Sequence, residues 1–160
     1  KRIRKLLDKL LGKNILTDEQ ARKVTETFET NKKYLANSQL LPVFWDIHFD
    51  NFIVNEQFEL QAIIDLETVI IAALDYPLFV IEKLTDEPHK YLREEDEQYA
   101  DVKDYARLKE WYRTYYPEMF AFENIDERVK LYQLIDTLHL LVDWSSSTEL
   151  YDKLDELTRK

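Results

Sequence analysis

The chain has 160 residues with a formal net charge of −10, a length typical of one ordinary domain. Hydrophobic residues at 45% and charged residues at 34% exclude a disordered tail, and no apolar run approaches the ~20 residues that span a bilayer. The absence of cysteine excludes disulfides, thiolate zinc sites and a cysteine nucleophile, which fits a reducing, cytoplasmic location. The negative charge disfavours nucleic acid as a partner and favours cations. We therefore expect neither nucleic-acid nor membrane partners.

The glycine count is the most informative feature of the composition, because the whole chain has a single glycine. Phosphate-binding loops of the Walker, Rossmann and kinase types all require several glycines, so none is present in this sequence. One glycine and four prolines also predict that most of the chain is helical.

Two helices are predicted at the start of the sequence. The first has one apolar stripe and ends at Gly12, where a left-handed C-terminal cap is expected. Thr17 and Gln20 have the spacing of a capping box for a second helix over about residues 18–37. The stripe of the first helix consists of Ile3, Leu6, Leu7, Leu10 and Leu11.

The pattern changes over residues 40–66. A short apolar run at 40–45 leads into a polar loop at 46–51. Two short strands are then predicted at 52–54 and 60–64, joined as a hairpin, and no other segment has a convincing strand pattern.

The remainder is predicted to be helical, over residues 78–84, 94–115, 125–144 and 148–158. Asn124 with Glu127, and Ser146 with Glu149, have capping-box spacing for the last two helices. Residues 1–160 are thus interpreted as a single, mainly α domain (α+β) with one small hairpin. The expected core face of the 125–144 helix consists of Ile125, Val129, Tyr132, Ile135, Leu138 and Val142.

Three oxygen-bearing side chains are predicted to converge. Asp46 and Asn51 lie five residues apart in one loop, and Asp65 follows the second strand of the hairpin. Because a hairpin returns its two ends to one place, these residues should be neighbours. Mg²⁺ prefers such oxygen ligands, so Asn51 and Asp65 are the predicted metal ligands. Asp46 would stay free to orient an incoming hydroxyl group.

The spacing Asp, four residues, Asn, then a hairpin and a further Asp resembles the catalytic region of protein kinases. It is most similar to the aminoglycoside phosphotransferase and choline kinase branch of the protein-kinase-like superfamily. The similarity covers about residues 41–84. It is carried by Phe44-Trp45-Asp46-Ile47-His48-Phe49-Asp50-Asn51-Phe52-Ile53-Val54, Ile63-Ile64-Asp65-Leu66-Glu67 and Asp75-Tyr76-Pro77-Leu78.

The resemblance implies a role for each matching position. Asp46 would be the catalytic base, Asn51 and Asp65 would bind magnesium and thereby the nucleotide, and Asp75 would support the catalytic loop. The chain would be the helical carboxy-terminal lobe of a kinase-like fold. With Mg²⁺, the full-length protein would transfer the γ-phosphoryl group of ATP or GTP to a hydroxyl of a small, cationic molecule resembling an aminoglycoside or choline.

Two features depart from the family pattern. Phe44-Trp45 replaces the usual His-Gly before the catalytic aspartate, and no glycine-rich loop or strand lysine precedes the motif. We therefore expect a fragment that lacks the nucleotide-binding lobe and is inactive by itself. The alternatives are a degenerate kinase-like module that serves as a binding scaffold, and a helical protein whose acidic hairpin is only a surface turn.

Several other residues have a structural explanation beside a functional one. His48 is interpreted as a structural histidine of the loop, and Glu67 as either a helper of the metal site or a surface residue. An aromatic cluster favours a core role over a substrate wall. Two aspartates and a histidine on a late helix fit either an acceptor pocket or a solvated face. The cluster is Trp111, Tyr112, Tyr115 and Tyr116, and the trio is Asp136, His139 and Asp143.

Overall fold

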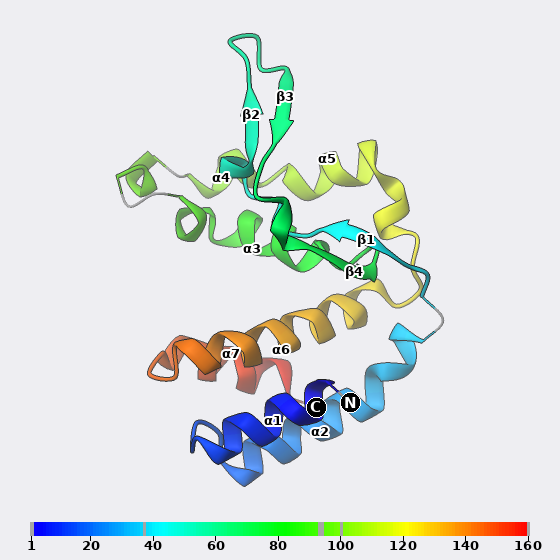
Figure 1. Cartoon of the computed structure of the whole chain (residues 1–160), viewed down its shortest axis with the longest axis vertical. Helices are drawn as coiled ribbons and strands as arrows, with labels where there is room; N and C mark the ends of the chain where they lie inside the picture. The colour runs from blue at the N-terminus through cyan, green and yellow to red at the C-terminus, as the bar shows by residue number, and fades with distance from the viewer. Residues whose placement is uncertain (1, 37, 93–94, 100, 160) are drawn as a thin grey trace. The chain divides into compact units, whose positions relative to one another are not determined.

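The protein is described by a computed structural model covering residues 2–36, 38–92, 95–99 and 101–159. It is mainly helical, with two small antiparallel sheets (Figure 1). The chain divides into two compact units, one formed by Lys1–Asn37 with Asp126–Lys160 and the other by Ser38–Ile125. Within the described part of the chain, no helix combines the length and the apolar character needed to cross a bilayer.

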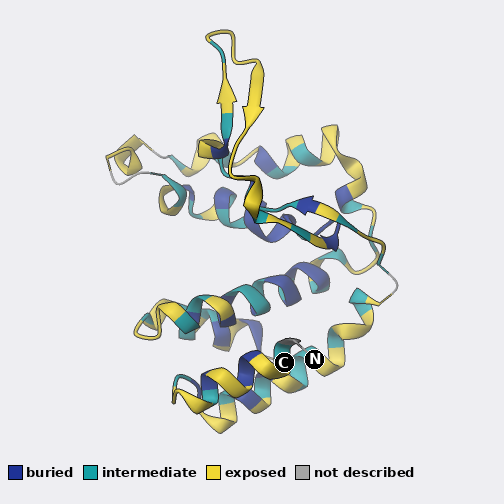
Figure 2. Cartoon of the chain, viewed as in Figure 1, coloured by how far each residue is buried: buried dark blue, intermediate teal, exposed yellow. Residues whose placement is uncertain are grey.

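The first unit is a helical assembly of both chain ends. Its helices are α1 (Arg2–Gly12), α2 (Asp18–Asn31), α6 (Ile125–Asp143) and α7 (Thr148–Leu157), with a 3₁₀ turn, η1, at Lys32–Leu35. Their apolar faces share one core, visible as the dark blue segments of these helices in Figure 2. The core consists of Leu6, Leu7, Leu10, Leu16, Ala21, Val24, Leu134, Leu138, Leu141, Leu154 and Leu157.

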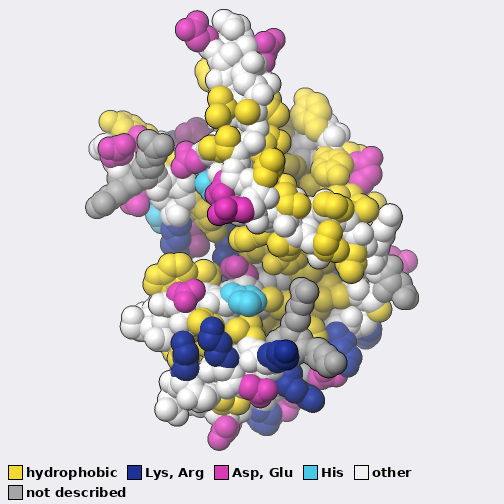
Figure 3. Space-filling view, in the orientation of Figure 1, with side chains coloured by type: hydrophobic (Ala, Val, Ile, Leu, Met, Phe, Trp, Pro, Cys, Tyr) yellow, Lys and Arg dark blue, Asp and Glu magenta, His cyan; other side chains and the backbone are white. Residues whose placement is uncertain are grey.

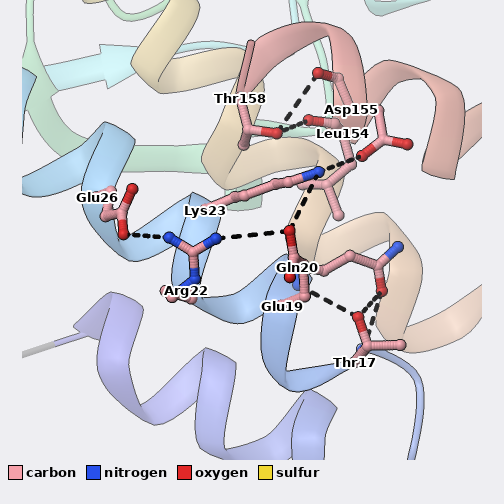
Figure 4. Close-up of polar contacts among 9 residues, drawn as sticks. All are labelled: Thr17, Glu19, Gln20, Arg22, Lys23, Glu26, Leu154, Asp155 and Thr158. Atoms are coloured by element: carbon pink, nitrogen blue, oxygen red, sulfur yellow. Dashed lines mark hydrogen bonds and ion pairs between the residues drawn. The ribbon is translucent and has the colours of Figure 1, made fainter. Parts of the chain in front are cut away.

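The predicted capping box of α2 is confirmed. The backbone N–H of Gln20 donates to the Thr17 hydroxyl at 3.2 Å, and the Thr17 N–H donates to the Gln20 side chain at 2.9 Å (Figure 4). These bonds satisfy two N–H groups that a helix start leaves unpaired. Figure 4 also shows Lys23 between Glu19 and Asp155, an exposed ion-pair set that joins α2 to α7.

Helix α1 ends at Gly12, as predicted, but the predicted left-handed cap at this glycine is wrong. The left-handed residue after the helix is Asn14, at φ 54°. Asparagine tolerates this conformation, so it replaces glycine as the cap. Helix α2 ends at Asn31 and continues only as η1, short of residue 37.

The two later capping boxes are also corrected. Asn124 has φ 55° and so does not adopt the extended N-cap conformation, and the N-cap of α7 is Ser147 rather than Ser146. The core face of α6 includes the predicted Val129, Tyr132 and Leu138. Ile125, Ile135 and Val142 are only half-buried, while Leu131, Leu134 and Leu141 are buried in addition.

A buried arginine connects α6 to η1 inside the first unit. The Arg128 guanidinium donates to the backbone carbonyl of Tyr34 and, at 3.1 Å, to the hydroxyl of Tyr132. Arginine is seldom buried unless its donors are partnered, so these bonds account for its place in the helix.

The second unit contains both sheets. Strand β1 (Leu40–Phe44) pairs antiparallel with β4 (Val69–Ala73), with Leu40 opposite Ala73 and Phe44 opposite Val69. Strand β2 (Phe52–Val54) pairs with β3 (Leu60–Ile63), which confirms the predicted hairpin. The β1–β4 pair was not predicted from the sequence. Its strands are separated by 24 residues, so no local turn signals their pairing.

Helix α3 (Leu78–Asp86) confirms the prediction for 78–84, and five of its side chains are buried. The predicted helix over 94–115 is wrong, because the chain forms η5 (Glu97–Tyr99), α4 (Val102–Tyr105) and α5 (Leu108–Tyr115), while residue 94 lies outside the described residues. Two further 3₁₀ turns are η4 (Pro88–Tyr91) and η6 (Pro117–Phe120). The aromatic cluster is largely exposed rather than core, with only Tyr112 half-buried.

The shared core of the first unit gives a stability test. Leu134→Ala should lower the free energy of unfolding by about 2–5 kcal/mol, because it leaves a cavity where a fully buried side chain was. Urea denaturation followed by circular dichroism measures the change. His139→Ala, on the exposed face of the same helix, should alter stability by less than about 0.5 kcal/mol. Equal losses in both variants would contradict this orientation of α6.

Candidate functional site

The loop between β1 and β2 is held by the side chain of Asn51. This residue is only 4% exposed. Its Nδ2 donates to the backbone carbonyl of Asp46 at 2.8 Å and lies 3.2 Å from Nε2 of His48. Its backbone N–H donates to the carbonyl of His48 at 3.2 Å. Asn51 therefore closes the stretch from Asp46 to Asn51 at both its start and its middle.

His48 lies between the two predicted functional side chains of this loop. Its Nε2 is 3.5 Å from Oδ1 of Asp46 as well as 3.2 Å from the Asn51 amide nitrogen. A neutral ring accepts from Asn51 at Nε2 and carries its proton on Nδ1, whereas a charged ring donates from Nε2 to Asp46. Nδ1 is buried without a hydrogen-bond partner among the described residues. The His48 ring thus lies within contact distance of both the Asp46 carboxylate and the Asn51 amide.

The hairpin brings Asp65 back to this loop. The N–H of Ile64, the residue before Asp65, donates to the carbonyl of Asn51 at 2.9 Å. Asp65 adopts a left-handed conformation, with φ 59° and ψ 40°, and its carbonyl accepts from the hydroxyl of Thr68 at 3.1 Å. The backbones of the predicted metal ligands Asn51 and Asp65 are thus neighbours, and the Asp65 residue is exposed.

Asn51 is oriented so that it can contribute an oxygen. Both of its hydrogen-bond contacts use Nδ2, and neither uses Oδ1. No group of three or more His, Asp or Glu side chains with metal-binding geometry occurs among the residues that the structure describes. Asn51 and Asp65 together would supply two protein oxygens to an ion, and other ligands would have to complete its shell.

The site lies in a long segment without positive side chains. Residues 34–82 contain no lysine or arginine but eight aspartates and glutamates. Carboxylates without neighbouring cations create a negative potential that attracts divalent ions and amines. This charge pattern supports a cation site and disfavours direct binding of an unaccompanied phosphate.

Asp75, the predicted support residue, lies at the junction of β4 and α3. It is completely buried, and its backbone carbonyl accepts from the N–H of Leu78 at 3.1 Å at the start of α3. It follows β4, the partner of the strand that leads into the Asp46 loop. Its position in the chain therefore suits a supporting role better than contact with a ligand.

The two residues that depart from the kinase pattern pack within the second unit. The Trp45 ring stacks on Phe79 of α3 at 6.0 Å between centroids, and Tyr76 meets Trp45 edge-on at 6.4 Å. Phe44 contacts Phe52 edge-on at 6.3 Å. These aromatic contacts connect the strand before Asp46 to α3 and to β2. In place of a flexible His-Gly turn, the chain has an aromatic anchor directly before the loop.

Several other candidate residues are exposed to solvent. They are Glu67, Asp50 within the loop, and His139 and Asp143 of the trio on α6. Exposure of the last two favours the solvated-face interpretation over an acceptor pocket. Sequence reasoning gave His48 only a structural role. Its spacing, two residues from Asp46 and three from Asn51, is the signal for its contacts with both.

Comparison of this chain with protein-family models, with curated proteins and with solved structures found no match.

The Asn51 bridge gives the next prediction. Asn51→Ala should lower the free energy of unfolding by about 1–3 kcal/mol, because the partly buried Asp46 carbonyl loses its donor. Asn51→Asp should cost at least as much, since it places a carboxylate oxygen against that carbonyl. Urea denaturation measures both changes. Asp50→Ala, an exposed neighbour, is the control. An Asn51→Ala variant as stable as this control would show that the amide does not hold the loop.

Proposed function

We propose that this chain is the carboxy-terminal lobe of a magnesium-dependent phosphotransferase. The full-length protein would transfer the γ-phosphoryl group of ATP or GTP to a hydroxyl of a small, cationic molecule. The observation that carries the proposal is the set of hydrogen bonds made by Asn51. Its side chain donates to the Asp46 carbonyl, and its own carbonyl accepts from the N–H of Ile64, the residue before Asp65. The family resemblance of residues 41–84 supplies the reaction class.

In this proposal each of the three residues has a separate role. The Asp46 carboxylate accepts a hydrogen bond from the acceptor hydroxyl and aims its oxygen at the phosphorus. Asn51 Oδ1 and the Asp65 carboxylate would hold Mg²⁺, which would neutralise charge on the phosphates. His48, beside Asp46, restrains the rotation of that carboxylate. The negative segment around them favours an acceptor that carries positive charge.

The proposal assigns the nucleotide-covering lobe to sequence outside these 160 residues. The chain has a single glycine and therefore cannot supply a glycine-rich phosphate loop. We accordingly expect the isolated chain to be inactive, with activity restored only in the full-length protein.

A second candidate function is a degenerate kinase-like module that binds another protein. The packing of Trp45 on Phe79 and Tyr76 favours it, because a bulky, anchored residue stands where active family members have glycine. Such a module would keep the fold but lose affinity for nucleotide with Mg²⁺. Binding of MgATP therefore distinguishes the two candidates.

Asp46 is the most direct test of the enzymatic proposal. In the full-length protein, Asp46→Asn should reduce kcat by roughly 10²–10⁴-fold, because the amide cannot accept the hydroxyl proton. Transfer of labelled phosphate to a panel of aminoglycosides and choline measures the rate. Asp50→Asn, an exposed carboxylate in the same loop, should retain activity. Undiminished transfer by Asp46→Asn would contradict the proposed role.

The metal ligands are tested through binding instead of turnover. Asp65→Ala in the full-length protein should weaken MgATP binding at least tenfold while Mg-free ATP binds as in the unaltered protein, since only the metal contact is removed. Isothermal titration calorimetry with and without Mg²⁺ separates the two affinities. Glu67→Ala, two residues along, is the matched control. If the unaltered full-length protein binds no MgATP, the scaffold function is favoured.

A further inference from the structure

The tip of the β2–β3 hairpin is a closely bonded turn. The Phe58 N–H donates to the Asn55 carbonyl at 2.9 Å, and the Asn55 N–H donates to the Glu59 carbonyl at 3.0 Å. The Asn55 side-chain oxygen accepts from the N–H groups of Gln57 and Glu59 at 3.0 and 2.9 Å. These bonds define a tight turn followed by one left-handed residue, a common three-residue hairpin loop.

Phe58 is an unusual occupant of the left-handed position in this loop. Its φ is 62°, a conformation that glycine and asparagine adopt easily and that strains a bulky side chain. The residue is nevertheless 87% exposed, so packing against the described residues offsets little of this strain. Neither the backbone nor the solvent favours phenylalanine here, which points to a contact beyond the described residues.

The hairpin below the tip is also apolar and uncovered. All four residues of β3 are exposed, as are Ile53 and Val54, which are consecutive in β2 and so face opposite sides of the sheet. In the second unit, the hairpin extends away from the helices, with hydrophobic side chains along it and acidic ones at its end (Figures 1 and 3). Two strands alone are marginally stable in water, so such a hairpin gains from a partner.

The charge around the tip indicates what kind of partner fits. Glu56 and Glu59 flank the Phe58 ring in sequence, and residues 34–82 supply no lysine or arginine to offset them. A second copy docking tip to tip would bring like charges together, and anionic membranes and nucleic acids would be repelled. A protein pocket that is apolar inside and rimmed by lysine or arginine complements both the ring and the carboxylates.

We propose that the β2–β3 hairpin is a protein-docking arm in which Phe58 inserts as an anchor into an apolar, basic-rimmed pocket of a separate partner protein. Buried aromatic anchors surrounded by charged rims are the usual energetic centres of protein interfaces. The turn bonds around Asn55 present the ring in a fixed position, which reduces the entropy lost on binding. This role is independent of phosphoryl transfer.

Stability gives the first part of the test. Phe58→Gly should raise or preserve the melting temperature, because glycine relieves the left-handed strain and no internal packing is lost. A lower melting temperature would show that Phe58 serves the fold, and it would overturn the proposal.

Binding gives the second part. Benzoylphenylalanine is placed at position 58 of the full-length protein in its host cell, and at Tyr115 as a control that is 84% exposed. A partner that cross-links at position 58 but not at position 115 is then purified, and its affinity for the unmodified full-length protein is measured. The proposal is supported if Phe58→Gly weakens this affinity at least tenfold and Tyr115→Ala does not. The affinity should also fall with rising salt. No adduct specific to position 58, an adduct only with a second copy, or an affinity indifferent to Phe58→Gly would overturn the proposal.

Discussion

The candidate site depends on one buried carboxamide. Asn51 donates from a single nitrogen to the Asp46 carbonyl and faces the His48 ring, so the loop cannot open without exposing or orphaning a buried polar group. The same residue begins the hairpin, and its carbonyl receives the Ile64 N–H. Asp46, His48 and the residue before Asp65 are therefore connected through Asn51, and the Trp45 stack on Phe79 connects the start of the loop to α3. Whatever chemistry the loop performs, its geometry is set by this amide.

The sequence predicted the parts of the fold that local chemistry decides. The Thr17–Gln20 box, the 52–54 and 60–63 hairpin and helix α3 each depend on residues within a few positions of one another. Strand pairing between Leu40–Phe44 and Val69–Ala73 depends instead on the whole intervening segment, and its apolar runs could equally have belonged to helices. The prediction of one helix over residues 94–115 failed for a related reason. Few of the described residues there are buried, so the segment lacks the tertiary packing that stabilises a long helix.

The same distinction applies to the site. Spacing alone predicted that Asn51 and Asp65 meet at one end of a hairpin, and their backbones are neighbours there. Spacing could not predict that the Asn51 nitrogen points to Asp46 and its oxygen away, because amide orientation depends on the closed loop. Nor could it predict that Trp45, judged bulky for its position, packs on α3, since Phe79 lies 34 residues along the chain.

Glycine scarcity connects the site and the docking arm. With one glycine, which lies in a helix, the described part of the chain places other residues wherever the backbone turns left-handed: Asn14, Phe58, Asp65 and Asn124. Asparagine and aspartate accept this conformation at modest cost, so Asn14 and Asn124 need only a structural explanation. Asp65 also tolerates it, and the turn directs the chain at the end of the hairpin into η3 (Leu66–Thr68). Phe58 alone has neither a tolerant side chain nor a covering contact. Backbone strain of this kind clusters at functional sites, so the docking proposal is based on this residue and not on the other three.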